Sequence, residues 1–258
     1  MNHFRLLLCA LLLPLSLTAH ADLADTIDRI KPAIVIVGLY SATGSPQFVL
    51  RGTGFVVGDG NHVATNAHVL PGDNEPKTGN PNMLAATLVV QIRTAHGEWQ
   101  MRRATVAAAD PAHDLALLRF DGPPVARVAL KNSTVREGQN IAFMGFPIGG
   151  ALGYSPVTHR GIVASITPNV LPAPTARQLD PKVIRRTKDG SFNIYQLDAT
   201  AYPGNSGGPL FDPETGEVIG IINMVFVKGG KESVLSHPSG ISYAIPIQYL
   251  EELLATKR

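Results

Sequence analysis

The stretch Gly204-Asn205-Ser206-Gly207-Gly208-Pro209 places a serine within a run of glycines. A serine hydroxyl is a weak nucleophile unless a positioned base takes its proton and hydrogen-bond donors hold the resulting oxyanion. Glycines let the backbone turn tightly and point N–H groups inward, because they have no Cβ to obstruct positive φ angles. The stretch therefore predicts Ser206 as a nucleophile and an oxyanion hole at Gly204, Asn205 and Ser206, with the N–H groups of Gly204 and Ser206 as donors. A plain glycine-rich turn around a buried serine is the alternative, and the stretch alone leaves both open.

The same residues satisfy Gly-x-Ser-x-Gly, which in α/β-hydrolases marks a serine between a strand and a helix. In that fold the acid and the histidine follow the serine along the chain. Here Ser206 is followed by Gly-Gly-Pro-Leu-Phe, which favours a strand over a helix, and His237 is the only later histidine. This context excludes the α/β-hydrolase arrangement, so the base must lie upstream of the serine.

Two upstream residues stand in contexts that suit a catalytic base and its orienting acid. His68 ends an expected strand in Ala64-Thr65-Asn66-Ala67-His68-Val69, and Asp114 precedes another in His113-Asp114-Leu115-Ala116-Leu117-Leu118. Taken singly, each fits an ordinary surface histidine or a loop-capping aspartate. The three contexts in the order His, Asp, Ser favour a nucleophilic triad instead.

The pattern of apolar residues predicts an all-β fold. Short β-branched runs separated by Gly, Pro, Asn and Asp favour a sandwich or barrel over alternating strands and helices. The expected strands cover residues 34–39, 54–57, 62–65, 88–92, 115–120, 141–145, 161–166, 194–197, 218–223 and 241–244. A short helix is expected at 22–31, where Pro32 ends it, and a C-terminal helix at 247–256.

The three motifs together resemble the signature blocks of trypsin-like serine proteases, and more narrowly those of the bacterial HtrA/DegP (Do-like) branch. The separations 114 − 68 = 46 and 206 − 114 = 92 also fit that family. The resemblance covers about residues 23–254. It implies two Greek-key, six-stranded β-barrels of the chymotrypsin/trypsin-like kind with a C-terminal helix. The first barrel is expected at about 33–125 and the second at about 130–246, within a protease domain at 22–258.

The resemblance also implies a mechanism and a class of substrate. His68 would take the proton of Ser206 as Ser206 attacks a peptide carbonyl, and Asp114 would fix the tautomer of His68. Hydrolysis of the acyl-enzyme would complete a serine endopeptidase cycle on extended or unfolded polypeptides. The alternative is a non-catalytic or conditionally inactive peptide-binding module on the same fold.

The sequence departs from its relatives in three respects. Asn205 stands where animal trypsins carry an aspartate that pairs with a newly cut N-terminus, so activation by N-terminal cleavage is not expected. The chain ends twelve residues after Pro246, so no PDZ domain is expected, and a trimer remains one option for assembly. The predicted substrate pocket carries no charge, which disfavours Arg or Lys before the cut; its residues are Thr200, Ile222, Asn223 and Met224.

The N-terminus predicts export. Residues 1–5 carry one positive charge, residues 6–17 are mostly apolar, and Ala19-His20-Ala21 suits a signal peptidase, so residues 1–21 are expected to be a signal peptide cleaved after Ala21. The protein would then be periplasmic or extracellular. The apolar stretch is shorter than the roughly 20 residues that span a bilayer, so no stable membrane anchor is expected.

Composition limits the remaining function classes. A net charge of +2 over 258 residues gives no reason to expect nucleic acid as a partner. The eight histidines show no paired ligand spacing, and the single cysteine, Cys9, lies in the expected signal peptide. We therefore expect no metal and no cofactor. Long loops are expected at 71–82, 167–191 and 228–239, the second being either a solvated surface loop or one that contacts substrate.

Overall fold

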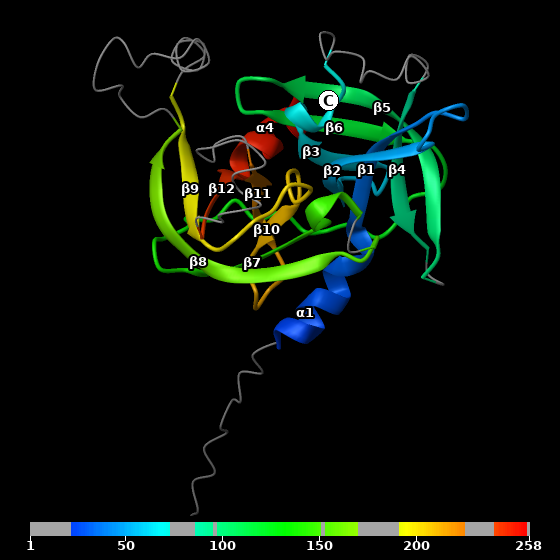
Figure 1. Ribbon diagram of the computed structural model, residues 1–258. Helices are drawn as coiled ribbons and strands as arrows, with labels where there is room; N and C mark the ends of the chain where they lie inside the picture. Colours follow the sequence, from blue (N-terminus) through cyan, green and yellow to red (C-terminus); the bar gives the residue numbers. More distant parts are fainter. Residues whose placement is uncertain are drawn as a thin grey trace, which may run out of the picture.

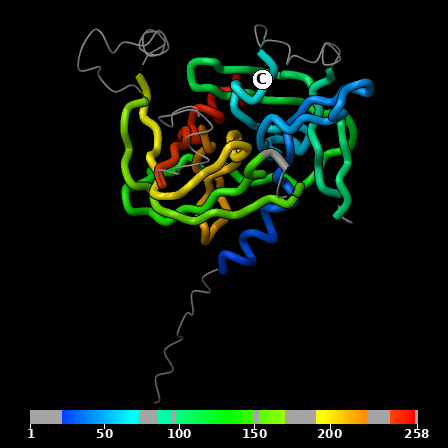
Figure 2. The backbone as a smooth tube through the Cα atoms, in the orientation of Figure 1, coloured from blue at the N-terminus to red at the C-terminus, as the bar shows by residue number. Residues whose placement is uncertain are grey.

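The computed structural model describes residues 22–72, 86–94, 97–150, 153–169, 191–224 and 240–256. These residues form two closed barrels of six antiparallel strands each, which stand side by side in Figures 1 and 2. The first barrel contains β1 (Ile34–Tyr40), β2 (Phe48–Val57), β3 (His62–Asn66), β4 (Thr87–Arg93), β5 (Trp99–Asp110) and β6 (Leu115–Phe120). The second contains β7 (Asn140–Gly145), β8 (Val157–Pro168), β9 (Asn193–Asp198), β10 (Pro209–Phe211), β11 (Val218–Asn223) and β12 (Ile241–Pro246).

Both barrels have the same strand order. In the first, the neighbours run β1-β2-β3-β6-β5-β4, and β4 returns to pair with β1. In the second, the equivalent order is β7-β8-β9-β12-β11-β10, and β10 pairs with β7. The chain therefore crosses the barrel between its third and fourth strands in each case. The fold expected from the sequence, two six-stranded barrels with a C-terminal helix, is confirmed.

The apolar runs form strands because the barrel interiors bury them. β3, β11 and most of β6 are buried along their length, which accounts for their nearly continuous apolar sequences. One hydrophobic cluster combines first-barrel residues such as Phe55 with second-barrel residues such as Phe146 and Phe211. Each such side chain stabilises the fold by about 1.5–3 kcal/mol when fully buried. The two barrels are thus joined by a shared apolar core.

The terminal helices strengthen this junction because each packs on the barrel that it does not adjoin in sequence. Helix α1 (Leu23–Ile30) leads into β1, yet Thr26 Oγ1 donates to Glu214 O at 3.4 Å and Arg29 Nη2 donates to Thr215 O at 3.2 Å in the second barrel. Helix α4 (Gln248–Ala255) follows β12, yet it contacts β5 and β6 of the first barrel. Helices α1 and α4 therefore link the two barrels in opposite directions (Figure 1).

The structure differs from the expectation at several elements. Strand β5 was not expected, because among its twelve residues only Ala104 is buried and its many polar residues hide the alternation. The strand expected directly after Ser206 is confirmed as the short β10. Helix α1 ends at Ile30, and Pro32 lies inside a 3₁₀ turn (Lys31–Ala33). The signal peptide and most of the three expected long loops lie outside the described residues.

Leu250 offers a test of the packing of α4 on the first barrel. Its side chain is fully buried in the shared cluster, whereas Leu254 on the same helix is only partly buried. We expect Leu250→Ala to lower the free energy of unfolding by about 2–5 kcal/mol, because it leaves a cavity in a packed core. Urea denaturation should show a clearly smaller loss for Leu254→Ala. Equal losses would contradict the packing described here.

Candidate functional site

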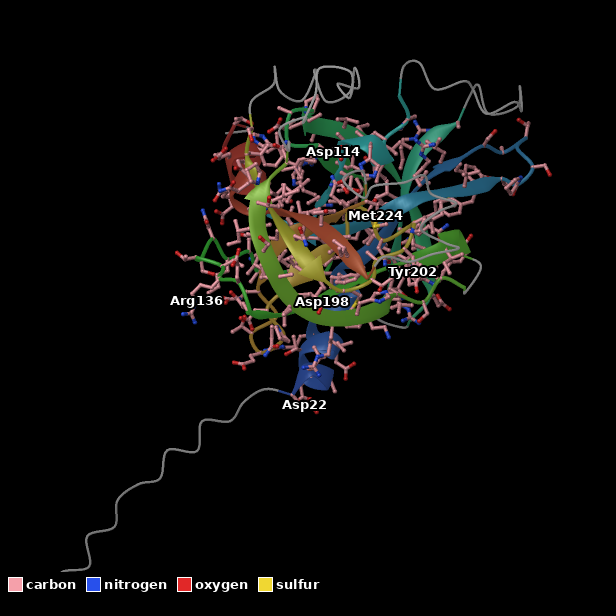
Figure 3. The ribbon with its side chains drawn as sticks, turned by 60° about the vertical axis from the view of Figure 1, so that its left-hand side comes forward. Asp22, Asp114, Arg136, Asp198, Tyr202 and Met224 are labelled. Carbon is pink, nitrogen blue, oxygen red and sulfur yellow. The ribbon has the colours of Figure 1, made fainter. Side chains whose placement is uncertain are left out.

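The register of two neighbouring strands brings His68 and Asp114 together. β3 and β6 are antiparallel, and Asn66 at the end of β3 pairs with Leu115 at the start of β6. His68 follows β3 in a 3₁₀ turn (Ala67–Val69), and Asp114 directly precedes β6. His68, two residues after the end of β3, therefore meets Asp114, one residue before the start of β6. Figure 3 labels Asp114.

The Asp114 carboxylate holds His68 through two hydrogen bonds. Asp114 Oδ2 lies 2.6 Å from His68 Nδ1, and Asp114 Oδ1 accepts the backbone N–H of His68 at 2.8 Å. A carboxylate oxygen accepts hydrogen bonds, so this contact favours the tautomer of His68 that carries its proton on Nδ1 and has the lone pair on Nε2. The backbone of Asp114 has φ 55°, in the left-handed region that aspartate tolerates better than most residues. Its carbonyl accepts from Ala67 N at 3.0 Å and from Asn66 Nδ2 at 3.1 Å, which fixes this turn.

Asn223 is a third partner of Asp114, one that the sequence did not reveal. Its Nδ2 donates to Asp114 Oδ2 at 2.6 Å, and the side chain is fully buried at the end of β11. The sequence placed Asn223 in the wall of the substrate pocket. Its signal was a polar residue closing an apolar strand, Val-Ile-Gly-Ile-Ile-Asn. Hydrogen-bond donors from both barrels therefore converge on one carboxylate.

Ser206 lies in the loop between β9 and β10, and this loop packs against β2 of the first barrel. The N–H of Thr53 donates to Ser206 O at 2.9 Å. Gly52 makes this approach possible, because a Cβ there would lie 2.7 Å from Val69 Cγ2 and 2.9 Å from Ser206 O. Ser206 is thus held beside the segment that carries His68, and it is 5% exposed. Among the described residues no hydrogen bond joins Ser206 to His68; such contacts often tighten only when substrate binds.

Among the N–H groups of residues 204–208, two have no acceptor in the part of the chain that the structure describes. The N–H of Asn205 donates to Tyr202 O, that of Gly207 to Ile222 O and that of Gly208 to Asn205 O, each at 2.9 Å. Within the described part of the chain, the N–H groups of Gly204 and Ser206 have no acceptor. These are the two donors expected from the sequence. The N–H of Asn205, also placed in the expected oxyanion hole, is bonded within the loop.

The side chain of Asn205 points into the second barrel. Its Nδ2 lies 3.4 Å from His159 Nε2, and the His159 ring stacks on Phe143 with centroids 4.6 Å apart. Burial lowers the pKa of His159 below its ordinary value, so the ring is neutral and its Nε2 can accept. Asn205 Oδ1 is buried without a hydrogen-bond partner in the described residues. The buried amide is therefore paired with a neutral ring and not with an ammonium group.

The other residues of the expected substrate pocket have different surroundings. Ile222 is fully buried in the apolar cluster of the second barrel, and Met224 packs partly against the same cluster. Thr200 is half-buried between Ala199 and Ala201. Residues 225–239, which follow Met224, lie outside the described residues, so the lining of the pocket stays a prediction.

The described residues contain no group of three or more His, Cys, Asp or Glu side chains placed to hold a metal ion. Across the same residues, no helix has both the length and the apolar character needed to cross a membrane.

Comparison with known proteins identifies the family. Residues 52–221 match the family described as trypsin-like peptidase domain. The chain belongs to the trypsin-like peptidase family. This trypsin-like peptidase is 31% identical over 214 residues to the mitochondrial serine protease HTRA2 of Drosophila willistoni, covering 82% of this chain and 39% of that relative. The match to HTRA2 of Drosophila persimilis has the same identity and covers 40% of the relative. The chain thus spans well under half the length of these curated relatives.

Solved structures agree with this family. Deg5 superposes with a TM-score of 0.60 at 24% identity, covering 89% of this chain and 90% of that one. The HtrA-type protease AlgW, solved with a tripeptide, superposes with a TM-score of 0.61 at 23% identity, covering 91% of this chain and 62% of that one. At these identities the structures show the fold, and the likeness to HtrA-type proteases expected from the motifs is confirmed over the protease domain.

His159 generates a testable dependence of stability on pH. Its pKa is lowered in the folded state, whereas the unfolded chain has a histidine pKa of about 6.5. The stabilising contribution of neutral His159 is therefore present above about pH 6.5 and is lost as the pH falls toward the folded-state pKa. We expect the peptidase to lose more unfolding free energy than His159→Gln between about pH 7.5 and about pH 5. Glutamine keeps an acceptor for Asn205 but does not titrate, and parallel curves for the two proteins would contradict the prediction.

Proposed function

We propose that this chain is an exported serine endopeptidase that cleaves extended or unfolded polypeptides, with Ser206 as nucleophile, His68 as general base and acid, and Asp114 as the orienting carboxylate. The observation that carries the proposal is the 2.6 Å contact between His68 Nδ1 and Asp114, beside a serine whose own N–H and that of Gly204 have no acceptor among the described residues. Membership of the trypsin-like peptidase family supports the same assignment. The non-catalytic or conditionally inactive peptide-binding module is the alternative that the experiment below must exclude.

The chemistry follows from the hydrogen bond that His68 Nδ1–H donates to Asp114, which leaves the lone pair on Nε2. His68 Nε2 accepts the proton of Ser206 Oγ as that oxygen attacks the peptide carbonyl, and Asp114 stabilises the imidazolium without being protonated. The N–H groups of Gly204 and Ser206 stabilise the oxyanion. His68 then protonates the leaving amine, the C–N bond breaks, and an acyl-enzyme remains on Ser206. Water, activated by the same histidine, hydrolyses the ester and restores the serine.

Two features support the proposed location and substrate. The pattern of residues 1–21 is that of a cleaved secretory signal, which supports a periplasmic or extracellular enzyme. The related protease AlgW was solved with a tripeptide. A peptide in extended form suits a site at the junction of two barrels, because main-chain hydrogen bonds to a strand edge need no particular side chain.

Labelling with a fluorophosphonate tests the assignment. Expressed from Met1 in a bacterial host, the chain is expected in the exported fraction with Asp22 as its first residue. The probe should label this protein and not the Ser206→Ala variant, because it reacts only with a serine that has a working base and oxyanion hole. A folded parent that does not label would sink the constitutively active enzyme and favour the binding module.

Asn223 generates a second prediction about activity. A hydrogen bond to a charged group contributes about 1.5–3 kcal/mol, so Asn223→Ala should lower kcat/KM on a peptide substrate by about 10- to 150-fold if that energy is lost in the transition state. Asn223→Asp should be more damaging, because it sets a second carboxylate against Asp114. The melting temperature of each variant separates this effect from unfolding. Activity in Asn223→Asp that matches Asn223→Ala would contradict the direct contact with the Asp114 carboxylate.

A further inference from the structure

Thr53 joins three segments at a fully buried position in β2. Its Oγ1 donates to Gly204 O at 2.6 Å and accepts the N–H of Phe146 at 3.0 Å. Its own N–H donates to Ser206 O at 2.9 Å. A residue of the first barrel therefore binds the carbonyl groups on either side of Asn205, in the loop that belongs to the second barrel.

The peptide groups of this loop alternate in how they are held. In a trans peptide the C=O and the N–H point in opposite directions, so a bond to one fixes the other. The Gly204–Asn205 and Ser206–Gly207 peptide groups are bonded at both ends, and Thr53 supplies a donor to each. The Pro203–Gly204 and Asn205–Ser206 groups are bonded only at their carbonyls, by Ile148 N and Gly208 N. Neither of their N–H groups has an acceptor within the described residues.

The hydroxyl of Thr53 makes two hydrogen bonds in this arrangement. It has one hydrogen, which it gives to Gly204 O, and it uses a lone pair for Phe146 N. Gly145 packs so closely that a Cβ there would lie 2.9 Å from Oγ1. Removal of the hydroxyl would take away the partner of the C=O of half-buried Gly204 and of the N–H of buried Phe146. Rotation of the Gly204–Asn205 peptide group is one way to relieve that cost.

We propose that the Thr53 hydroxyl is the positioning group of the oxyanion hole: it fixes the Gly204–Asn205 peptide group and thereby aims the N–H groups of Gly204 and Ser206. The proposal rests on the proposed function, because it assigns Thr53 a part in that site. Thr53 does not touch the substrate, and it acts through the loop. It is also the point at which the first barrel controls the conformation of a loop in the second.

Three variants separate this role from a general loss of stability. Thr53→Val removes the hydroxyl at nearly constant shape, and Thr53→Ser retains it. Thr26→Val is the matched control. Thr26 is a fully buried threonine in α1, outside the loop around Ser206, and its Oγ1 donates to Glu214 O. Fluorophosphonate labelling and hydrolysis of a peptide substrate are measured for all three beside the parent.

We expect Thr53→Val to lower kcat and the rate of labelling by about 100-fold with little change in KM, which is the usual effect of losing one oxyanion donor. Thr53→Ser should remain close to the parent, and Thr26→Val should label like the parent despite a lower melting temperature. The downfield proton signal of His68 Nδ1–H should persist in Thr53→Val, since the contact with Asp114 is untouched. If the parent labels, equal labelling by Thr53→Val, or loss of that signal in the variant, would overturn the proposal.

Amide hydrogen exchange provides a readout that does not need catalysis. The N–H of Asn205 is bonded to Tyr202 O in the same peptide group that Thr53 holds. We expect it to exchange at least about tenfold faster in Thr53→Val than in Thr26→Val, because its peptide group is no longer fixed. Unchanged exchange would refute the positioning role even if the parent did not label. A parent that does not label, with faster Asn205 exchange in Thr53→Val, would contradict the proposed enzyme but not the role of Thr53 in the loop.

Discussion

The carboxylate of Asp114 is the point at which the two barrels meet in the candidate site. It accepts hydrogen bonds from His68 in the first barrel and from Asn223 in the second. The Asp114 side chain is 17% exposed, and a carboxylate so far withdrawn from water needs several donors, since an unpaired one would be destabilising. The same bonds fix the histidine ring and relate it to β11. The position of the His68 ring is therefore set by the packing of two separate barrels against each other.

That packing depends on features that lie far from the site. The shared core joins Phe55 of the first barrel with Phe146 and Phe211 of the second, and it excludes water along their junction. Helix α1 precedes the first barrel in the sequence but binds the second, and helix α4 follows the second barrel but packs on the first. A core at this density resists small displacements, because any shift forfeits many contacts at once. The chain has a single cysteine, so distances near 2.6 Å at Asp114 are kept without a disulfide between the barrels.

The sequence predicted those parts of the molecule that local patterns encode. Buried strands such as β6 and β11 were found because both faces are apolar, and His68 and Asp114 were found because their flanking residues are distinctive. Strand β5 was missed because its side chains are mostly exposed or small. The hydrogen bonds of Asn223 and Thr53 were missed for another reason. Each depends on a contact between residues more than 100 positions apart, 109 for Asn223 with Asp114 and 151 for Thr53 with Gly204.

Within the described residues, the hydrogen bonds that hold the loop around Ser206 come from neutral groups. Asn205 cannot form an ion pair, and its amide faces a histidine whose pKa is lowered by burial. The carbonyls from Tyr202 to Ser206 are all bonded, and Thr53 binds two of them from the first barrel. Hydrogen bonds between neutral groups contribute only about 1 kcal/mol each, so the loop conformation is held by their number and by their shared dependence on the barrel junction. A change in how the barrels meet would therefore reach Asp114 and the serine loop together, which couples His68 and the N–H groups of Gly204 and Ser206 through one interface.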